Sequence, residues 1–281
     1  MQMKCRKWVA GFVLLWMLCL LCLLLPGLAH AAAPEISADA AIVVDRGTGA
    51  VLYEKNADKR EYPASMTKMM TCLLALENGK PDRIVEASAN AADVECTRLR
   101  GGEQIRLQDI LTQMMLISDN GAATAVGESF GDGDIGYFAQ KMNDRAKTLG
   151  MTSTHFVNAN GMPDENHYTT ARDMSKLAMA AFARPDFRQI VGTKQKNIYY
   201  IRPAGRVESC ENTNELLWSY EGCVGGKTGW TNAARGCLTV AADRNGHELI
   251  AIVMHSEDEE SRFREAAALL DYGFAAEQGA Q

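Results

Sequence analysis

Ser65 and Lys68 are the two side chains best suited to nucleophilic chemistry. They begin a strongly helical segment, and their i, i+3 spacing places hydroxyl and amine on one helix face, one turn apart. A serine can attack a carbonyl carbon only if a neighbouring group takes its proton. A lysine can take it if burial or a second cation lowers its pKa from about 10.4 to about 7–8, and Lys227 offers such a cation.

Two further short elements follow in the chain. Ser118-Asp119-Asn120 stands at a break between helical stretches, and Lys227-Thr228-Gly229 stands on a predicted strand. Alone, each has an ordinary explanation, such as a helix cap, a turn or a hairpin residue. With the serine–lysine pair they form an ordered set whose chance occurrence is on the order of one in a hundred. The set predicts a single serine-dependent site.

The elements that would position these residues follow from the hydrophobic pattern. We predict a β-hairpin over residues 41–54 and a closing helix whose apolar face includes Phe263, Ala266 and Leu270. Between them, helices are predicted over 65–79, 107–118, 120–130, 135–150 and 169–182, and strands over 197–201, 223–230, 236–242 and 249–255. This order predicts an α/β (α+β) fold, with a mainly antiparallel sheet built from both chain ends and a central helical cluster.

Residues 1–33 have the pattern of a secretory signal peptide: Lys4, Arg6 and Lys7, then an apolar run, then small residues. The run is also long enough for an uncleaved N-terminal membrane anchor, so both interpretations stay open. We expect an exported protein with one catalytic domain over 34–276 and a short tail over 277–281. Removing the leader takes the formal net charge from −6 to −9, which argues against a nucleic-acid partner.

The sequence predicts neither a disulfide framework nor a metal site. Five cysteines remain after the leader, an odd number with no metal-binding spacing, and we expect them to be small buried side chains: Cys72, Cys96, Cys210, Cys223 and Cys237. His247-Glu248 lacks the second histidine of a zinc-protease helix. We therefore expect no metal and no organic cofactor.

The three elements together are typical of β-lactamases and penicillin-binding proteins. The longer strings resemble the D-alanyl-D-alanine carboxypeptidases among the low-molecular-mass penicillin-binding proteins, over about residues 36–275. They are PASMTKMMT, GGEQIRLQDILTQMMLISDN, MNDRAKTLGMTSTHFVNANGM, HYTTARDM, ENTNELL, GGKTGWT and RFREAAALLDYGF. The resemblance implies the β-lactamase/transpeptidase-like fold.

The resemblance also implies roles for the catalytic residues. Ser65 would attack the carbonyl between the two terminal D-alanines of a peptidoglycan stem peptide, with Lys68 as general base. Ser118 would relay a proton to the departing D-alanine, and Asn120 would hold Lys68 and the substrate amide in register. Lys227 would supply positive potential. β-Lactam antibiotics would acylate the same serine and act as covalent inhibitors.

Substrate-binding roles are implied in the same way. Thr228 and Arg262 match the positions that bind the terminal carboxylate of the substrate. The backbone N–H groups of Ser65 and Trp230 would form the oxyanion hole, and Gly229 would let the strand approach the substrate closely.

Two positions depart from the family pattern. Gly121 follows the second motif, where the family usually carries an acidic residue. The segment 158–161 reads Asn-Ala-Asn-Gly, where the family more often has Pro and His between Asn and Gly. The roles of both positions therefore stay open.

Two alternative functions also stay open. A β-lactamase would need a loop carboxylate that activates water, and Glu165 lies in a suitable region but without a Glu-x-x-Leu-Asn string. A non-catalytic wall-binding or sensor module on the same fold would belong to a different class of protein, although the intact motifs argue against it.

Overall fold

The computed structural model describes residues 32–278, so the predicted leader lies almost entirely outside the described residues. The predicted site residues all belong to a compact unit, Ala33–Phe274. Its strands are β1 (Ala40–Asp45), β2 (Val51–Lys55), β3 (Ile84–Glu86), β4 (Gln104–Arg106), β5 (Gln195–Tyr199), β6 (Val207–Glu211), β7 (Cys223–Thr231), β8 (Arg235–Arg244) and β9 (His247–Ser256). The helices are η1 (Ala64–Thr67), α2 (Lys68–Asn78), α3 (Ala89–Asp93), α4 (Leu107–Leu116), α5 (Asn120–Phe130), α6 (Ile135–Thr148), α7 (Ala171–Phe182), α8 (Pro185–Val191), α9 (Leu216–Ser219) and α10 (Ser261–Gln278).

The main sheet confirms the predicted topology. Its five strands run in the order β2-β1-β9-β8-β7, and every neighbouring pair is antiparallel. The N-terminal β1 pairs with the C-terminal β9, with Val43 opposite Ala251. Both ends of the chain therefore build one sheet, and β7, which carries Lys227-Thr228-Gly229, forms one edge of it.

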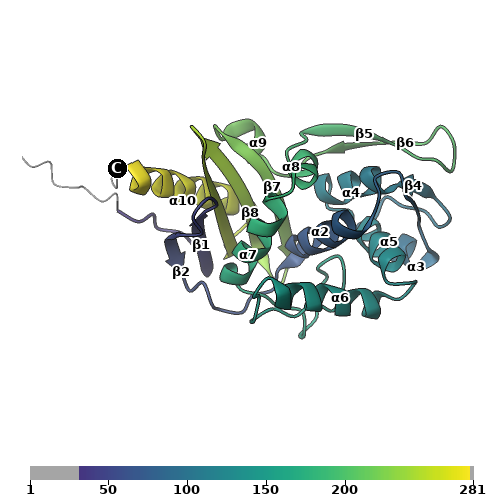
Figure 1. The fold of residues 1–281 in the computed structure, drawn as a ribbon, viewed down its shortest axis with the longest axis horizontal. Helices are drawn as coiled ribbons and strands as arrows, with labels where there is room; N and C mark the ends of the chain where they lie inside the picture. The colour runs from purple at the N-terminus through teal and green to yellow at the C-terminus, as the bar shows by residue number, and fades with distance from the viewer. Residues whose placement is uncertain (1–31, 279–281) are drawn as a thin grey trace, which may run out of the picture. The chain divides into compact units, whose positions relative to one another are not determined.

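The alternation of side chains along the central strands explains the layered arrangement. On β1, Ile42 and Val44 belong to the apolar cluster shared with the helices of the middle of the chain, and Val43 belongs to a second cluster with Phe263 and Leu270 of α10. Both faces of the sheet are thus covered, with α10 over one face and α7 over the other (Figure 1). The helical cluster contains the helices predicted between the two halves of the sheet.

The short elements were not predicted from the sequence. Strands β3, β4 and β6 and helices α3, α8 and α9 span only three to seven residues each. Such segments are too short to show a hydrophobic period, and β3 and β4 exist because each is the other's partner.

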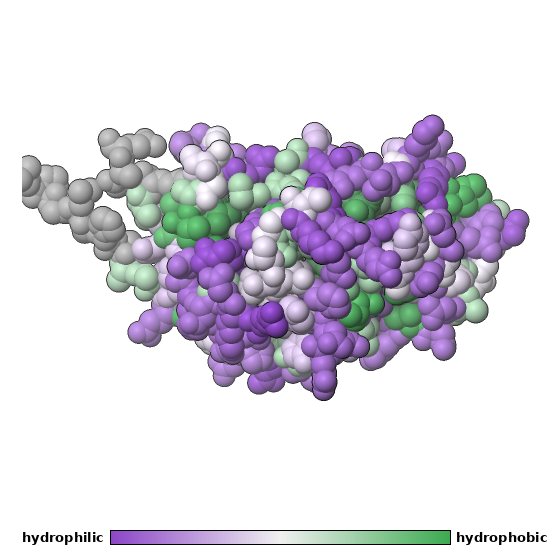
Figure 2. Space-filling model, turned by 60° about the horizontal axis from the view of Figure 1, so that its bottom comes forward, coloured by the Kyte–Doolittle hydropathy of each residue, from purple (hydrophilic) through white to green (hydrophobic). Residues whose placement is uncertain are grey.

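The surface in Figure 2 is mainly hydrophilic, with hydrophobic residues in small separate groups. Over residues 32–278, no helix combines the length and apolar character needed to cross a membrane.

Candidate active site

Ser65 lies in the 3₁₀ turn η1, which leads directly into α2. The preceding residue, Ala64, has a φ of +46°, an unfavourable conformation for a residue with a side chain. Close packing keeps the turn in this conformation: a Cβ on Gly161 would overlap the Ala64 carbonyl oxygen, and one on Gly229 would lie 3.2 Å from the Ser65 nitrogen. Loop 158–161 and strand β7 therefore hold the turn from two sides, and the Ser65 side chain stays partly accessible.

Lys68 is fully buried, and three oxygen atoms surround its amine. Its Nζ lies 2.7 Å from Ser65 Oγ, 2.6 Å from Asn120 Oδ1 and 2.7 Å from the backbone oxygen of Asn160. An amide or carbonyl oxygen can only accept, so two N–H bonds of the amine are committed to Asn120 and Asn160. In the neutral amine, the remaining position is the lone pair, which faces the Ser65 hydroxyl. This arrangement is suited to removing the serine proton.

The protonation of Lys68 fits that arrangement. Burial lowers the pKa of the Lys68 amine to about 7, and the Asp119 carboxylate opposes the shift. A large fraction of the amine is therefore neutral near pH 7. The sequence suggested two causes, burial and the charge of Lys227. Burial is the one that lowers the pKa of Lys68, and the charge of Lys227 does not contribute, so this part of the prediction was wrong. The effect runs the other way: burial and then the charges of Lys68 and Arg262 hold the pKa of Lys227 well below its ordinary value.

The second motif lies in the turn between α4 and α5. Ser118 has a φ of +60°, and its side chain makes no hydrogen bond to any part of the described chain, residues 32–278. Asn120 donates through Nδ2 to the backbone oxygen of Glu95 at 2.9 Å, which fixes the amide so that Oδ1 points to Lys68. The motif therefore contributes both a free hydroxyl and an oriented amide.

Asp119 has a structural position rather than a place beside Ser65. It is 1% exposed and caps α5 by accepting from the Ala122 nitrogen. It also accepts from Thr97 Oγ1, the Arg98 nitrogen and Gln113 Nε2, at 2.8–2.9 Å. This network ties loop 94–98 to the second motif.

The third motif runs along the edge strand β7, which packs against η1. Lys227 is buried, and its Nζ donates to the Thr228 carbonyl at 2.9 Å. Thr228 Oγ1 lies 2.6 Å from Thr213 Oγ1, and Trp230 is half-buried next to Gly229 on the same strand.

Arg262, near the start of α10, also reaches this edge. It is 5% exposed, and its Nη1 donates to the Gly229 carbonyl at 2.9 Å. Burial lowers the pKa of its guanidinium, while Glu259, 3.1 Å from Nη2, opposes the shift. Its Nε is buried and makes no hydrogen bond within residues 32–278. The structure thus brings together the first motif and the second through Lys68, and the first and third through Gly229.

Sequence reasoning missed two contributors. Asn160 supplies a backbone oxygen to Lys68, and the buried side chain of His167 contacts Thr67 within the first motif. The Asn-Ala-Asn-Gly segment was the available signal for the first. The structure also explains why glycine stands at position 121, because a Cβ there would overlap the Ala91 carbonyl oxygen and the Thr97 side chain.

The prediction that the five cysteines are buried was right in part. Cys72, Cys210 and Cys237 are buried, but Cys223 is half-buried and Cys96 is exposed, and all five are free thiols. Cys96 is in a turn with a φ of +59°, where its backbone oxygen accepts from the Asn120 nitrogen, so this loop lies along the second motif rather than in the core.

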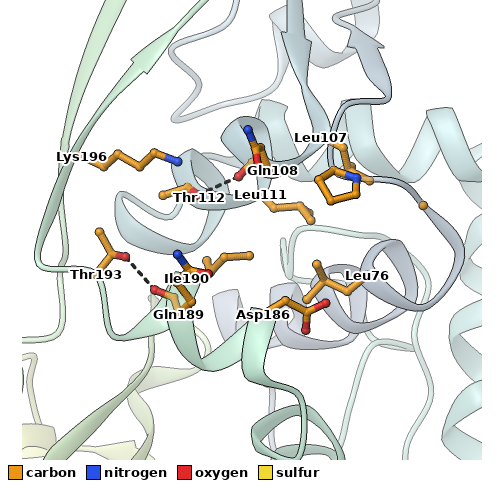
Figure 3. A pocket seen from close by; sticks show the side chains of 12 residues that line it. Leu76, Leu107, Gln108, Leu111, Thr112, Asp186, Gln189, Ile190, Thr193 and Lys196 are labelled. Atoms are coloured by element: carbon orange, nitrogen blue, oxygen red, sulfur yellow. Dashed lines mark hydrogen bonds between the residues drawn. The ribbon is translucent and has the colours of Figure 1, made fainter.

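Two other features of the described chain lie apart from these motifs. A cavity of about 270 Å³ is lined by Leu76 of α2, Leu111 of α4 and Ile190 of α8, and no predicted site residue lines it (Figure 3). Asp39, Glu61 and His255 lie close enough together to hold a metal ion, and they include none of the predicted site residues. Lys59 already pairs with both carboxylates at 2.7 Å.

Comparison with known proteins agrees with this geometry. The profile of the family described as D-alanyl-D-alanine carboxypeptidase matches residues 28–258. The chain is 35% identical over 246 residues to D-alanyl-D-alanine carboxypeptidase DacF of Bacillus subtilis, covering 85% of this chain but only 62% of that protein. It is 33% identical over 258 residues to the D-alanyl-D-alanine carboxypeptidase of a Streptomyces species, covering 86% and 89%.

The fold comparison gives the same result. The crystal structure of a Streptomyces DD-transpeptidase is similar with a TM-score of 0.83 and 32% sequence identity, covering 87% of this chain and all of that one. A penicillin-binding protein homologue from Mycobacterium tuberculosis gives 0.82 and 30%. The expected transpeptidase-like fold is confirmed, and the chain belongs to the D-alanyl-D-alanine carboxypeptidase family of serine peptidases.

Proposed function

We propose that this chain is an exported serine-type carboxypeptidase that removes the terminal D-alanine from peptidoglycan stem peptides. The observation that carries the proposal is the position of Lys68 Nζ, 2.7 Å from Ser65 Oγ and held there by two other oxygen acceptors. A buried, partly neutral amine in this place can act as general base.

The first half of the reaction is acylation of Ser65. Lys68 takes the hydroxyl proton, and Oγ bonds to the carbonyl carbon between the two D-alanines. The oxyanion that forms lies at the backbone N–H groups of Ser65 and Trp230, each contributing about 3 kcal/mol to lowering the barrier. When the C–N bond breaks, the proton that Lys68 took from Ser65 passes through the Ser118 hydroxyl to the departing amine, and Lys68 is neutral again.

Recognition of the substrate carboxylate is assigned to the cationic edge of the sheet. Thr228 offers a hydroxyl, and Lys227 and Arg262 are cations on or beside β7. The pKa of both cationic groups is lowered by burial, so an incoming carboxylate would stabilise their charged forms. This accounts for a preference for a peptide that ends in a free carboxylate.

Water then hydrolyses the acyl-enzyme, and the β-lactamase alternative differs at this step. Glu165 is exposed and makes no hydrogen bond to the rest of the described chain, residues 32–278. No protein contact fixes this carboxylate in one position, and it lacks the flanking residues of a Glu-x-x-Leu-Asn string. We therefore expect a penicillin to acylate Ser65 and the resulting ester to be hydrolysed slowly, which makes β-lactams inhibitors rather than substrates.

The test combines two assays on wild type and Ser65→Ala. Wild type should release D-alanine from a pentapeptide ending in D-Ala-D-Ala and should retain labelled penicillin, and Ser65→Ala should do neither. Equal D-alanine release by the two proteins would refute the assignment of the nucleophile. Labelling without D-alanine release would support a sensor module, and rapid turnover of a chromogenic cephalosporin would support a β-lactamase. N-terminal sequencing of exported protein would show whether the leader is removed.

A further inference from the structure

His167 is a buried histidine in contact with the first motif. It is 1% exposed, and its Nε2 lies 2.8 Å from the hydroxyl of Thr67, the residue before Lys68. Thr67 is completely buried. On the other side of the ring, the Val157 backbone nitrogen donates to Nδ1 at 3.1 Å. The imidazole therefore lies between the Ser65–Lys68 turn and the loop that follows Phe156.

These contacts determine where the ring carries its proton. A backbone N–H can only donate, so Nδ1 must be the unprotonated acceptor. The proton then resides on Nε2 and is donated to Thr67 Oγ1. Burial lowers the pKa of His167 to about 4, with Asp164 opposing and His155 adding to the shift, so the neutral tautomer persists at physiological pH.

The two hydrogen bonds of His167, to Thr67 and from the Val157 nitrogen, form a bridge between two segments that both contact Lys68. Thr67 is its neighbour in the chain, and Val157 begins the segment whose Asn160 backbone oxygen accepts from Lys68 Nζ at 2.7 Å. His167 therefore sets the distance between the turn that carries the amine and the loop that receives one of its hydrogen bonds. The ring is itself held edge-on by Phe156, with centroids 5.6 Å apart.

We propose that His167 is a positioning residue for acyl transfer, acting through Thr67 and Val157 to keep the Lys68 amine directed at the Ser65 hydroxyl. It touches neither reacting atom. Loss of the bridge would leave the motif folded but its geometry looser, which would lower the rate of acylation more than the affinity for substrate. This inference rests on the proposed function.

Two substitutions separate the two halves of the bridge. His167→Gln places an amide N–H near Nε2 and keeps a donor for Thr67, whereas His167→Asn places an amide oxygen near Nδ1 and keeps only an acceptor for Val157. We expect His167→Asn to lower kcat for D-alanine release, and the rate of penicillin acylation, by about tenfold or more with KM within about twofold. His167→Gln keeps the contact with Thr67, the neighbour of Lys68, and gives up only the contact with Val157, three residues before Asn160, so it should lose less of kcat than His167→Asn does.

Thr67→Val tests the same contact from its other side. It should lower kcat as His167→Asn does, and the double variant should lose little more, because both changes remove one interaction. His155→Asn is the matched control: this ring contacts the Asn166 backbone oxygen in the same loop, and its loss should leave kcat unchanged.

Three results would overturn the inference: equal kcat for the Asn and Gln variants, wild-type kcat for Thr67→Val, or losses that only follow the melting temperature across all variants. Failure of the proposed function would look different. In that case wild type itself would release no D-alanine, and the penicillin acylation rates would still report on the Lys68–Ser65 geometry.

Discussion

Lys68 and Glu265 are two buried titratable side chains on opposite faces of the sheet, and their hydrogen bonds serve different purposes. Lys68 of α2 directs its amine at three oxygen atoms, one of which is the reactive hydroxyl of Ser65. Glu265 of α10 accepts from the Ser37 nitrogen and hydroxyl, both at 2.6 Å, from the Ala38 nitrogen at 3.2 Å and from Ser256 Oγ at 2.8 Å. Both groups are nearly inaccessible to water.

The difference lies in what surrounds each charge. The donors around Glu265 include two backbone N–H groups, so the carboxylate joins the segment before β1 to α10 and stabilises the fold. Lys68 contacts only neutral oxygen atoms, and burial lowers its pKa although the Asp119 charge opposes the shift. One buried polar group is therefore expected to serve stability and the other reactivity.

The largest expected effect is that of Lys68→Met. Removing the general base should lower kcat/KM for D-alanine release by about 10³-fold. Stability should change by no more than about 2 kcal/mol, because the lost hydrogen bonds are offset by removal of a buried amine. The checks are steady-state kinetics and urea unfolding. If Lys68→Met lowered the free energy of unfolding by much more than this while the folded fraction kept its activity, the division of roles between Lys68 and Glu265 would be wrong.

The pH dependence of the wild type sharpens the account of Lys68. The group must be neutral to accept the Ser65 proton, so kcat/KM should fall about tenfold per pH unit below a pKa of about 7. The Asp119 charge raises that pKa, so in Asp119→Asn, which still caps α5, the fall of kcat/KM on the acidic side of the profile should occur at lower pH. If the fall stays in place or occurs at higher pH in the variant, the titrating group is not Lys68.

The same comparison explains how far sequence reasoning could reach. Ser65, Ser118 and Lys227 were identifiable because each lies in a short contiguous motif of side chains with distinctive chemistry. The Asn160 contribution comes from a backbone oxygen, which every residue type has. Thr67 and His167 are 100 positions apart, and nothing in either local pattern indicates the contact.

The fold shows the same limit. Runs rich in apolar and β-branched residues predicted the long strands, because a strand that is buried on both faces reads as a continuous apolar run. β3 and β6 were missed because short strands depend on a partner elsewhere in the chain. The pattern of a helix or strand is local, whereas pairing and loop contacts are not.

Glu265→Ala tests the stability half of the comparison. Its four hydrogen-bond donors would lose their acceptor, two of them at backbone nitrogens. We expect the free energy of unfolding to fall by about 3 kcal/mol, or the melting temperature by about 6–12 °C, because buried donors without partners are destabilising. Glu265→Gln, which keeps one acceptor oxygen, should lose less. At 25 °C the folded fraction of both variants should have wild-type kcat, and a loss of kcat at full folding would show that this region also shapes the active site.

The smallest effect that still separates the two regions is expected at Gly121, where the chain departs from its family. A Cβ at this position would overlap the Ala91 carbonyl oxygen and Thr97, so in Gly121→Ala the segment from α3 to loop 94–98 must move away from α5. We expect this overpacking to lower the free energy of unfolding by about 1–3 kcal/mol. Because the Asn120 side chain donates to the Glu95 backbone oxygen in that loop, kcat should also fall by a few-fold, unlike in Glu265→Ala. Thermal melting with kinetics at 25 °C distinguishes the two: a stability loss with wild-type kcat would mean that loop 94–98 supports the fold alone and does not orient Asn120 toward Lys68.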